Sequence, residues 1–491
     1  MERVKKNIVL IDRGLRIFDS VYKSKTVRVK YLITDYDAQV EKIKKAYKVD
    51  HVFAATDSLN TKLTLLNNDI DYELIGKFKS TQLKSEHFHD RFSDDTNLIQ
   101  YYYFCALSFW NEVFSSGEIS AVVLDGVEHG ANYDNLVLDV AKSHGVDGYL
   151  IEGFAGRPIK TSLKNEFLVS YPSVSSFAIR DYRTREYVPI DCQKLNLTPT
   201  NLSNYLFYLD KKKEKAQKTP QELFRKITSI LSSLKGRIPY GYFMAFKSII
   251  SSKSLNFYNV GMPPSKLLNN IKYVKRLEKF YNSIAVEFDS SKKSIFYAMH
   301  FEPEASITVR TKLRNQLTII KMLSQSLPRG WTLYVKEHPD QFKTNRPGFW
   351  FFLITVHKFR TKEFYKEILK FDNVKILKTR TKSREVIQNS EAVISINGTI
   401  ALEAISFKKP LILFGHESTP IGLCDDVLKV TSSRQCRDAM KEIESGFSPV
   451  YVDFENIIKC HAFETSNFSP FEARLLVEQL VCNPGRNSGK S

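Results

Sequence analysis

Short apolar runs alternate with amphipathic, helix-like segments along residues 1–165. This alternation predicts a mainly parallel sheet with helices on both faces. The expected strands are Ile8–Ile11, Val29–Ile33, His51–Ala55, Tyr72–Ile75, Ala121–Asp125 and Gly148–Glu152, with helices over Ala38–Tyr47 and Tyr133–His144.

Residues 294–452 repeat the same pattern. The expected strands are Ile295–Met299, Thr332–Val335, Val374–Leu377, Ala392–Ile396 and Leu411–Phe414, and helices are expected to begin near Ser306, Lys362, Ser383 and Thr399. The sequence therefore predicts an α/β fold with two Rossmann-like domains facing a cleft, joined by a helical insertion.

The chain between the two patterns is basic and helical in character. Lys211–Lys215 precedes a helix that begins at Pro220, and Pro263-Pro264 precedes a second helix. The second helix has an apolar stripe, which favours a face packed on the core over a face lying on a membrane. The stripe consists of Leu267, Leu268, Ile271, Val274, Leu277 and Tyr281. Its basic opposite face is compatible with a position near an anionic bilayer.

These patterns divide the chain into four parts. We expect a first domain over 1–190, a basic helical insertion over 191–288, a second domain over 289–460, and a helix with a disordered tail over 461–491. A length of 491 residues allows this organisation at about 100–200 residues per domain.

Charge and apolar content restrict the partners. The net charge of +18 favours an anionic partner, for which nucleic acid, anionic lipid and an anionic sugar nucleotide are candidates, although a solubilising surface would look the same. No apolar run approaches the roughly 18 residues of a membrane span, and Ile8–Ile11 is too short for a signal peptide. We expect a cytoplasmic protein, at most peripheral on the inner face of the cell membrane, with its six widely spaced cysteines reduced.

Two strand-to-loop junctions carry the candidate chemistry. Tyr334–Pro339 ends an expected strand with the donors Lys336 and His338, and Ser395–Thr399 ends another with an Asn-Gly-Thr turn before a short helix. The first N–H groups of a helix have no internal partners, so this turn suits a phosphate or carboxylate. Together the junctions predict a phosphate-bearing ligand, although each alone is a common turn.

Three blocks of the second domain resemble the bacterial capsule and surface polysaccharide biosynthesis proteins, a family that includes Kdo transferases. The blocks are Phe296–Ser306, Leu327–Pro339, and Ile396–Thr399 with Glu403 and Lys409–Gly415. More weakly, Leu124–Gly130 resembles the acceptor-side domain of such enzymes.

The resemblance implies a GT-B type glycosyltransferase whose C-terminal domain binds the nucleotide sugar. The family's His-Pro motif falls on His338-Pro339, and its glycine-threonine turn and following Glu fall on Asn397, Gly398, Thr399 and Glu403. Its Gln-Pro pair falls on Glu302-Pro303, so Gln is replaced by Glu. A carboxylate there would repel the acid group of a Kdo-type donor.

Each of these residues is given a role and an alternative. Lys336, His338 and the N–H groups near Gly398 and Thr399 would stabilise the leaving phosphate without a metal or a further cofactor, although His338 could merely cap a strand end. Glu403 would bind ribose hydroxyls, or simply face the helix dipole.

The remaining carboxylates are expected to act on the sugars. Glu302 and Glu304 are candidates for contacting the transferred sugar, and Asp125, Glu128 or His129 for deprotonating an acceptor hydroxyl.

The sequence therefore predicts a glycosyltransferase that uses a nucleotide sugar and a saccharide or glycolipid acceptor. One alternative is a sugar-nucleotide epimerase of the UDP-sugar 2-epimerase type. Another is a nucleic-acid-binding protein, which is disfavoured because the Lys-rich segments lack interleaved aromatic residues.

Overall fold

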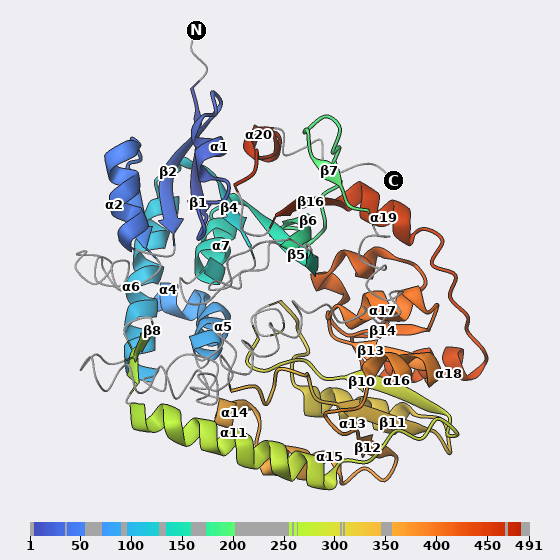
Figure 1. Ribbon diagram of the computed structural model, residues 1–491. Coiled ribbons are helices and arrows are strands. Elements are labelled where there is room, and N and C mark those ends of the chain that lie inside the picture. The colour runs from blue at the N-terminus through green and yellow to red at the C-terminus, as the bar shows by residue number, and fades with distance from the viewer. Residues whose placement is uncertain are drawn as a thin grey trace, which may run out of the picture.

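Two α/β domains, each built around its own sheet, make up the computed structural model (Figure 1). The structure describes residues 4–34, 37–54, 71–89, 96–126, 134–158, 173–201, 255–257, 260–262, 264–304, 307, 310–344, 356–466 and 470–482. The predicted pair of Rossmann-like domains is confirmed by the strand order and the parallel pairing within both sheets.

The first sheet has the order β3-β2-β1-β4-β5-β6-β16-β7. Its strands are β1 (Lys6–Ile11), β2 (Val27–Thr34), β3 (His51–Ala54), β4 (Ile119–Asp125), β5 (Asp147–Pro158), β6 (Ser173–Asp181), β7 (Thr198–Pro199) and β16 (Ala462–Ser466). Its helices are α1 (Phe18–Tyr22), α2 (Asp37–Ala46), α4 (Tyr72–Lys77), α5 (Lys79–His89), α6 (Thr96–Ser115), α7 (Asp134–Ser143) and α20 (Arg474–Cys482). The first five strands in this order pair in parallel, whereas β6 runs antiparallel to β5.

One predicted strand of this domain is wrong. Tyr72–Ile75 forms the start of helix α4. The side chain of Asp71 accepts a hydrogen bond from the backbone N–H of Glu73 at 2.8 Å, which is the N-terminal cap that favours a helix. Four residues with mixed apolar character fit either period, so the cap decides between them.

The second sheet has the order β12-β11-β10-β13-β14-β15, with every pair parallel. Its strands are β10 (Ser294–Ala298), β11 (Thr332–Lys336), β12 (Val374–Ile376), β13 (Ala392–Ser395), β14 (Leu411–Leu413) and β15 (Val427–Lys429). Around it lie α11 (Pro264–Ile284), α13 (Gln316–Ser326), α14 (Val356–Phe359), α15 (Lys362–Ile368), α16 (Ser383–Asn389), α17 (Ile400–Ser406), η3 (His416–Ser418), η4 (Pro420–Leu423), α18 (Ser433–Glu444) and α19 (Phe454–His461).

This strand order is that of a dinucleotide-binding sheet. From β10 the chain adds strands first on one side, to β12, and then on the other side, from β13 to β15, so the switch point lies between β10 and β13. The helix starts predicted at Lys362, Ser383 and Thr399 are confirmed by α15, α16 and α17. The helix start predicted near Ser306 lies outside the described residues.

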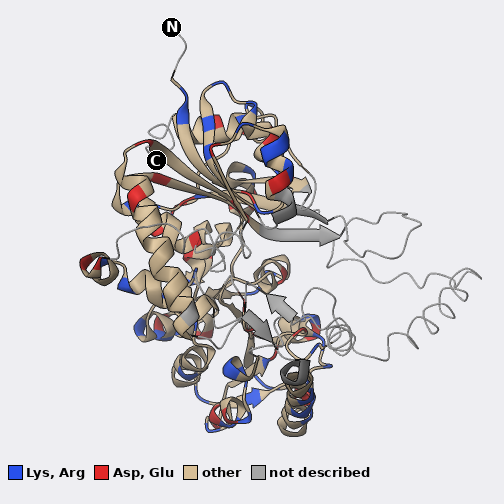
Figure 2. Cartoon of the chain, turned by 90° about the vertical axis from the view of Figure 1, so that its left-hand side faces the viewer, with Lys and Arg blue, Asp and Glu red and all other residues tan. Residues whose placement is uncertain are grey.

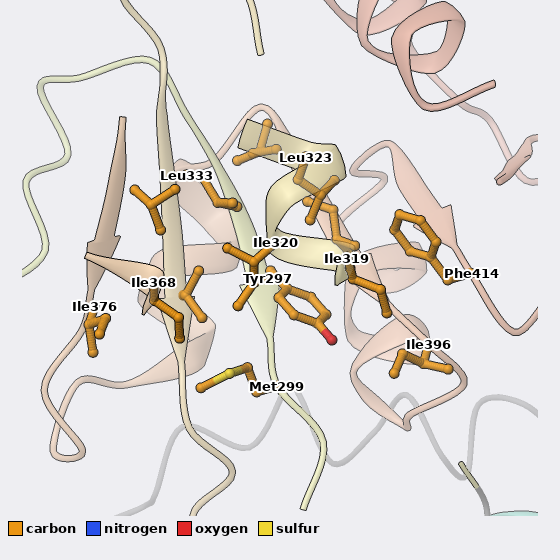
Figure 3. Packing of buried hydrophobic residues seen from close by; sticks show 14 of the residues in the cluster. Tyr297, Met299, Ile319, Ile320, Leu323, Leu333, Ile368, Ile376, Ile396 and Phe414 are labelled. Carbon is orange, nitrogen blue, oxygen red and sulfur yellow. The ribbon is translucent and has the colours of Figure 1, made fainter. Parts of the chain in front are cut away.

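Both faces of the second sheet are buried, as expected for parallel strands. Tyr297 of β10 and Leu333 of β11 face one cluster, against Ile320 of α13, whereas Phe296 and Tyr334 face a cluster on the other side. Figure 3 shows Tyr297 and Leu333 packed around Ile319, Ile320 and Leu323. At about 1.5–3 kcal/mol for each fully buried large apolar side chain, these two layers are the main support of the sheet.

Helix α11 packs along the second domain beside α14 and α15 (Figure 1). Its residues Ile271, Val274, Leu277 and Tyr281 are buried in the core, so the predicted core-facing stripe is confirmed for them. Of the region predicted as a helical insertion, residues 202–254, with Lys211–Lys215 and Pro220, lie outside the described residues. A two-stranded pair, β8 (Leu255–Phe257) and β9 (Val260–Met262), precedes the helix.

The end of the chain returns to the first domain. Strand β16 pairs with β6 and β7, and α20 places Leu476, Val477 and Leu480 in the first-domain core. Within the described residues no helix is long and apolar enough to cross a membrane. In Figure 2, Lys and Arg lie on many surface elements of both domains, with Asp and Glu among them.

Tyr281 generates a stability prediction. Its buried hydroxyl accepts from the N–H of Glu337 at 3.0 Å and donates to the carbonyl of Leu377 at 2.7 Å. In Tyr281→Phe the N–H of Glu337 and the carbonyl of Leu377 lose this hydrogen-bond partner. We therefore expect a loss of about 1–3 kcal/mol in the free energy of unfolding, measured by urea denaturation. Tyr72→Phe, at an 88% exposed side chain, is the control. Equal stability of the two variants would contradict the prediction.

Candidate functional site

A cavity of about 440 Å³ lies at the carboxyl ends of the strands of the second sheet. Its walls come from the ends of β10, β11 and β13 and the segments that follow them, from Ser383 at the start of α16, from the segment after β14, and from Gly153 of β5 in the first domain. Because β10 and β13 are the strands between which the order reverses, the cavity occupies the position where open α/β sheets bind ligands. Its size is within the range of small-molecule sites, about 300–1,000 Å³.

The structure brings most of the predicted donor-site residues together in this cavity. Its lining includes Glu304, Lys336, His338, Asn397, Gly398, Thr399 and Glu403. Two junctions separated by many residues in the sequence therefore form one site, because parallel strands end at the same edge of the sheet.

Lys336 is the last residue of β11 and its side chain is almost fully buried, at 4% exposure. Among the described residues its ammonium has a single polar contact, the Ser383 hydroxyl oxygen at 3.5 Å, and no carboxylate partner. Burial lowers the pKa of Lys336, while the Glu337 carboxylate opposes that shift. A buried cation without a counter-ion at a cavity wall favours an anionic ligand.

His338 presents a hydrogen-bond donor at the same edge. Its Nδ1 accepts from the backbone N–H of Asp340 at 3.1 Å, so the proton of the neutral ring resides on Nε2. The ring lies 6.0 Å from that of Phe301. In this orientation the Nε2–H of His338 is the hydrogen-bond donor of the neutral ring.

The turn after β13 is built on His300, which the sequence reasoning did not select. Its Nε2 accepts from the N–H groups of Ile396 at 3.3 Å and Asn397 at 3.4 Å. A Cβ atom on Gly398 would lie 3.0 Å from Cε1 of His300 and 3.2 Å from Oγ of Ser395, so this position favours glycine. The only local signal was the position of His300 just after a strand, inside the Phe296–Ser306 block.

The amide groups of this turn differ from expectation. The N–H of Gly398, predicted to hold a phosphate, donates to Oγ of Ser395 at 3.0 Å. The side chain of Asn397 donates to the Ser418 hydroxyl at 3.0 Å. Thr399 is exposed at the cavity and precedes a helix of only seven residues. Most of the positive character of the site therefore comes from side chains.

Burial makes His300 a neutral residue. Burial, together with the smaller effects of the charges of His338 and Arg360, lowers the pKa of His300 to about 3. Since Nε2 serves as an acceptor, the proton lies on Nδ1.

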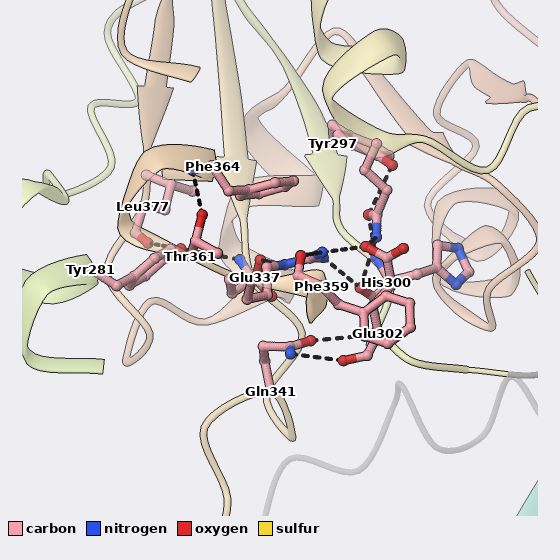
Figure 4. A network of polar contacts seen from close by, with 12 residues as sticks. Tyr281, Tyr297, His300, Glu302, Glu337, Gln341, Phe359, Thr361, Phe364 and Leu377 are labelled. Atoms are coloured by element: carbon pink, nitrogen blue, oxygen red, sulfur yellow. Dashed lines mark hydrogen bonds and ion pairs between the residues drawn. The ribbon is translucent and has the colours of Figure 1, made fainter. Parts of the chain in front are cut away.

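A buried polar network supports the two strand ends from below (Figure 4). The fully buried guanidinium of Arg360 pairs with Glu337, Nε to Oε1 at 2.7 Å, and with Glu302, and it donates to the carbonyl of His300 at 3.2 Å. Gln316 and Gln341 bind the backbone of the same loop. Burial opposes the cation, yet Glu337 and Glu302 hold the pKa of Arg360 above its ordinary value.

Glu302 therefore differs from its predicted role. Its carboxylate pairs with Arg360 and accepts from Nε2 of Gln316 at 2.8 Å, and it is not among the residues that line the cavity. Because Arg360 and Gln316 hold this carboxylate outside the cavity lining, Glu302 is not placed to contact the acid group of a donor sugar. The family's Gln is thus replaced by Glu302 in the supporting network and not at the cavity wall.

Two carboxylates outside the Arg360 network line the cavity, in addition to Glu337. Glu304 follows the Glu302–Pro303 pair, and Glu403 lies in the first turn of α17. Burial raises the pKa of Glu403, against the opposing effect of Arg384. Both are in place to accept hydrogen bonds from sugar hydroxyls.

The first-domain candidates do not join this cavity in the described structure. Asp125 ends β4 and is bound by Arg16, through Nε at 2.8 Å and Nη2 at 2.5 Å. Asp12 lies nearby, accepts from the backbone N–H groups of Arg16, Ile17 and Phe18, and has its pKa raised to about 6 by burial and by Asp125. Glu128 and His129 lie outside the described residues.

A buried ion-pair network connects the two domains at the cavity wall. Arg310 of the second domain lines the cavity and pairs with Glu152 of β5, which also pairs with Arg180 of β6 at 2.8 Å. Sequence reasoning missed all three residues, because no local motif marks them. Elsewhere, the six cysteines are free thiols, and in the described part of the chain no three His, Cys, Asp or Glu side chains are grouped to hold a metal.

Comparison with known proteins gives only distant similarity. No protein-family model and no curated protein sequence matches the chain. Among solved structures, UDP-GlcNAc 2-epimerase from Methanocaldococcus jannaschii is 11% identical over 98% of this chain and 99% of its own, with a TM-score of 0.25. Thermosulfurimonas dismutans KpsC, a beta Kdo 2,4 transferase, is 12% identical over 74% of this chain and 88% of its own, with a TM-score of 0.30.

The same organism's KpsC beta Kdo 2,7 transferase is 15% identical over 45% of this chain and 65% of its own, with a TM-score of 0.25. Scores this low carry no argument about chemistry. The fold assignment therefore rests on the strand order, and the site on its own geometry.

His300 yields a pH prediction. Its folded pKa of about 3 lies below the ordinary 6.5, so the unfolded state binds a proton first. The stability that depends on neutral His300 is complete above pH 6.5 and falls as the pH drops towards 3, by up to about 1.4 kcal/mol per pH unit. His300→Gln keeps an acceptor and removes the titration. Urea denaturation between pH 6.5 and 4.5 should show a shallower loss for the variant, and parallel curves would contradict this.

Proposed function

We propose that the protein is a glycosyltransferase that moves a sugar from a nucleotide-activated donor to a growing surface polysaccharide or glycolipid. The observation that supports this best is the buried ammonium of Lys336, which lines the switch-point cavity with no carboxylate partner among the described residues. A diphosphate supplies the missing counter-charge, and switch-point cavities suit nucleotides.

The leaving phosphate would be stabilised by fixed donors. As the bond between the anomeric carbon and the phosphate oxygen breaks, negative charge grows on the nucleotide. Lys336 supplies a full positive charge and His338 supplies the Nε2–H donor, both held at strand ends. Because Glu337 and the His300 loop are held by Arg360, these donors need little reorganisation when the ligand binds. In this proposal the donors replace a metal ion.

The sugars would contact the carboxylates of the cavity. Glu403 accepts from ribose hydroxyls, and Glu304 contacts the transferred sugar. The acceptor approaches from the first domain, which reaches the cavity at Gly153. Asp125, Glu128 and His129 remain the proposed sources of a base, with Asp125 acting only if Arg16 releases it.

The acceptor is proposed to lie at an anionic membrane surface. The exposed face of α11 carries Lys272, Lys275, Arg276 and Lys279, which suits such a surface better than a nucleic acid, because no exposed aromatic side chain interleaves with them.

A sugar-nucleotide epimerase is the second candidate. The observation in its favour is that Glu304 and Glu403, the lining carboxylates outside the Arg360 network, come from the second domain, while Asp125 of the first domain is engaged by Arg16. An epimerase needs acid and base groups around one substrate and no acceptor.

Removing the charge of Lys336 tests the phosphate site. Lys336→Met should weaken binding of UDP, CMP or GDP, whichever binds the wild type, by about tenfold to a hundredfold, since a charge-assisted hydrogen bond contributes about 1.5–3 kcal/mol. Titration calorimetry measures the affinity. Lys343→Met is the control, because Lys343 is half exposed and pairs with Asp340. An unchanged affinity in Lys336→Met would remove the basis of the proposal.

Incubation without an acceptor separates transferase from epimerase. In D₂O with a sugar nucleotide that binds, we expect proton NMR to show no exchange at the sugar C2 position and only slow hydrolysis. Adding a polysaccharide acceptor should release the nucleotide, and EDTA should leave that rate unchanged. Deuterium incorporation at C2 without acceptor would favour the epimerase, and loss of transfer in EDTA would contradict the metal-free mechanism.

A further inference from the structure

Arg310 joins the two domains at the wall of the cavity. Its Nη2 contacts Oε2 of Glu152 in the first domain and donates to the carbonyl oxygen of Ser418 in the second at 2.8 Å. Its side chain is only 5% exposed, and that of Glu152 is 1% exposed. The contact is therefore a buried bridge and not a surface ion pair.

The carboxylate of Glu152 is shared between two arginines. Glu152 is already bound by Arg180, with Nε at 3.0 Å and Nη2 at 2.8 Å from Oε1, and it accepts from the hydroxyl of Tyr187 at 3.3 Å. One carboxylate thus faces two buried arginines. Arg310 therefore does not have this carboxylate to itself, and a buried guanidinium at a cavity wall favours an anionic ligand.

The guanidinium of Arg310 also has an unused donor. Its Nε is buried and makes no hydrogen bond, although Arg310 lines the cavity. Buried donors are nearly always paired in folded proteins, so an unpaired one at a cavity wall is a position where a ligand acceptor fits. The shared carboxylate and the unpaired Nε are separate observations that concern the same guanidinium.

Arg310 is connected to the turn after β13 as well. The residue that accepts its second hydrogen bond, Ser418, also accepts through its hydroxyl from Nδ2 of Asn397 at 3.0 Å, and that hydroxyl donates to the carbonyl of Gly415 at 2.6 Å. A continuous polar path therefore runs from Glu152 in the first sheet to the ligand-facing turn of the second.

We infer that Arg310 binds the anionic part of the ligand and at the same time holds the first domain against the second through Glu152. Ligand binding and the relative position of the domains are then coupled through one guanidinium. This inference rests on the proposed function for the anionic nature of the ligand, but the bridge between the domains does not depend on it. The simpler alternative is a bridge that never contacts ligand.

Two variants separate a bridge that binds ligand from a bridge that does not, because one removes Arg310 and the other removes its partner Glu152. Arg310→Met removes the cation, so binding of inorganic pyrophosphate should weaken about tenfold or more. Glu152→Gln removes the carboxylate that competes for Arg310, so pyrophosphate should bind as tightly as to wild type or more tightly. A merely structural bridge would weaken binding alike in both variants. Titration calorimetry on the full chain measures each affinity.

Lys312→Met is the matched control, because Lys312 lies two residues away and is 81% exposed. It should bind pyrophosphate like the wild type. Should Arg310→Met fail to fold, Arg310→Lys keeps the charge but lacks the Nε–H, and it should still bind pyrophosphate less tightly than wild type. Wild-type affinity in a folded Arg310 variant, or equal weakening in Glu152→Gln, would overturn the ligand contact.

Small-angle scattering without ligand tests the bridge by itself. Arg310→Met and Glu152→Gln should each have a larger radius of gyration than wild type and Lys312→Met, because the buried link between the domains is lost. Unchanged radii would overturn the bridging role. If pyrophosphate does not bind the wild type, the phosphate site of the proposed function and the ligand contact of Arg310 both fail, and scattering decides the bridge alone.

Discussion

The binding edge of the second sheet depends on one buried guanidinium, that of Arg360. It pairs with Glu302 after β10 and with Glu337 after β11, and it donates to the carbonyls of His300 and Phe359. A planar group with five donors can hold two strand ends at once, which an ammonium could not do. Breaking a buried pair of this kind costs about 3–5 kcal/mol, so both loops are held in place without a ligand.

Two neighbouring residues at the end of β11, Lys336 and Glu337, have different roles. Lys336 is the last residue of β11, and Glu337 follows it. Both residues line the cavity, but the carboxylate of Glu337 pairs with Arg360, whereas the ammonium of Lys336 has no carboxylate partner among the described residues. Departures from full pairing of buried groups are expected at functional sites, and the unpaired Lys336 lies where the strand order also places a ligand.

Much of the fold follows from local pattern, because each apolar run and each helix cap is recognised within a few consecutive residues. Thr361 caps α15 with its hydroxyl, accepting from the N–H of Phe364 at 3.0 Å, so the helix start was predictable. The segment from Tyr72 was misread because four residues do not separate a strand from a helix. The site was predictable as a set of strand-end residues, and His338, Lys336 and Gly398 do meet at one cavity.

By itself the sequence determined most of the parallel strands of two Rossmann-like sheets, several of their helices and the polar strand ends, because periodicity and turn chemistry are local. Only the tertiary structure decided which polar groups are satisfied within the protein. Arg360 pairs with Glu302 from 58 residues away, Arg16 pairs with Asp125 across 109 residues, and Arg310 pairs with Glu152 across 158 residues. These pairings depend on how distant segments pack. Local sequence therefore could not distinguish the polar residues of the supporting network from those of the bridge between the domains or of the cavity wall.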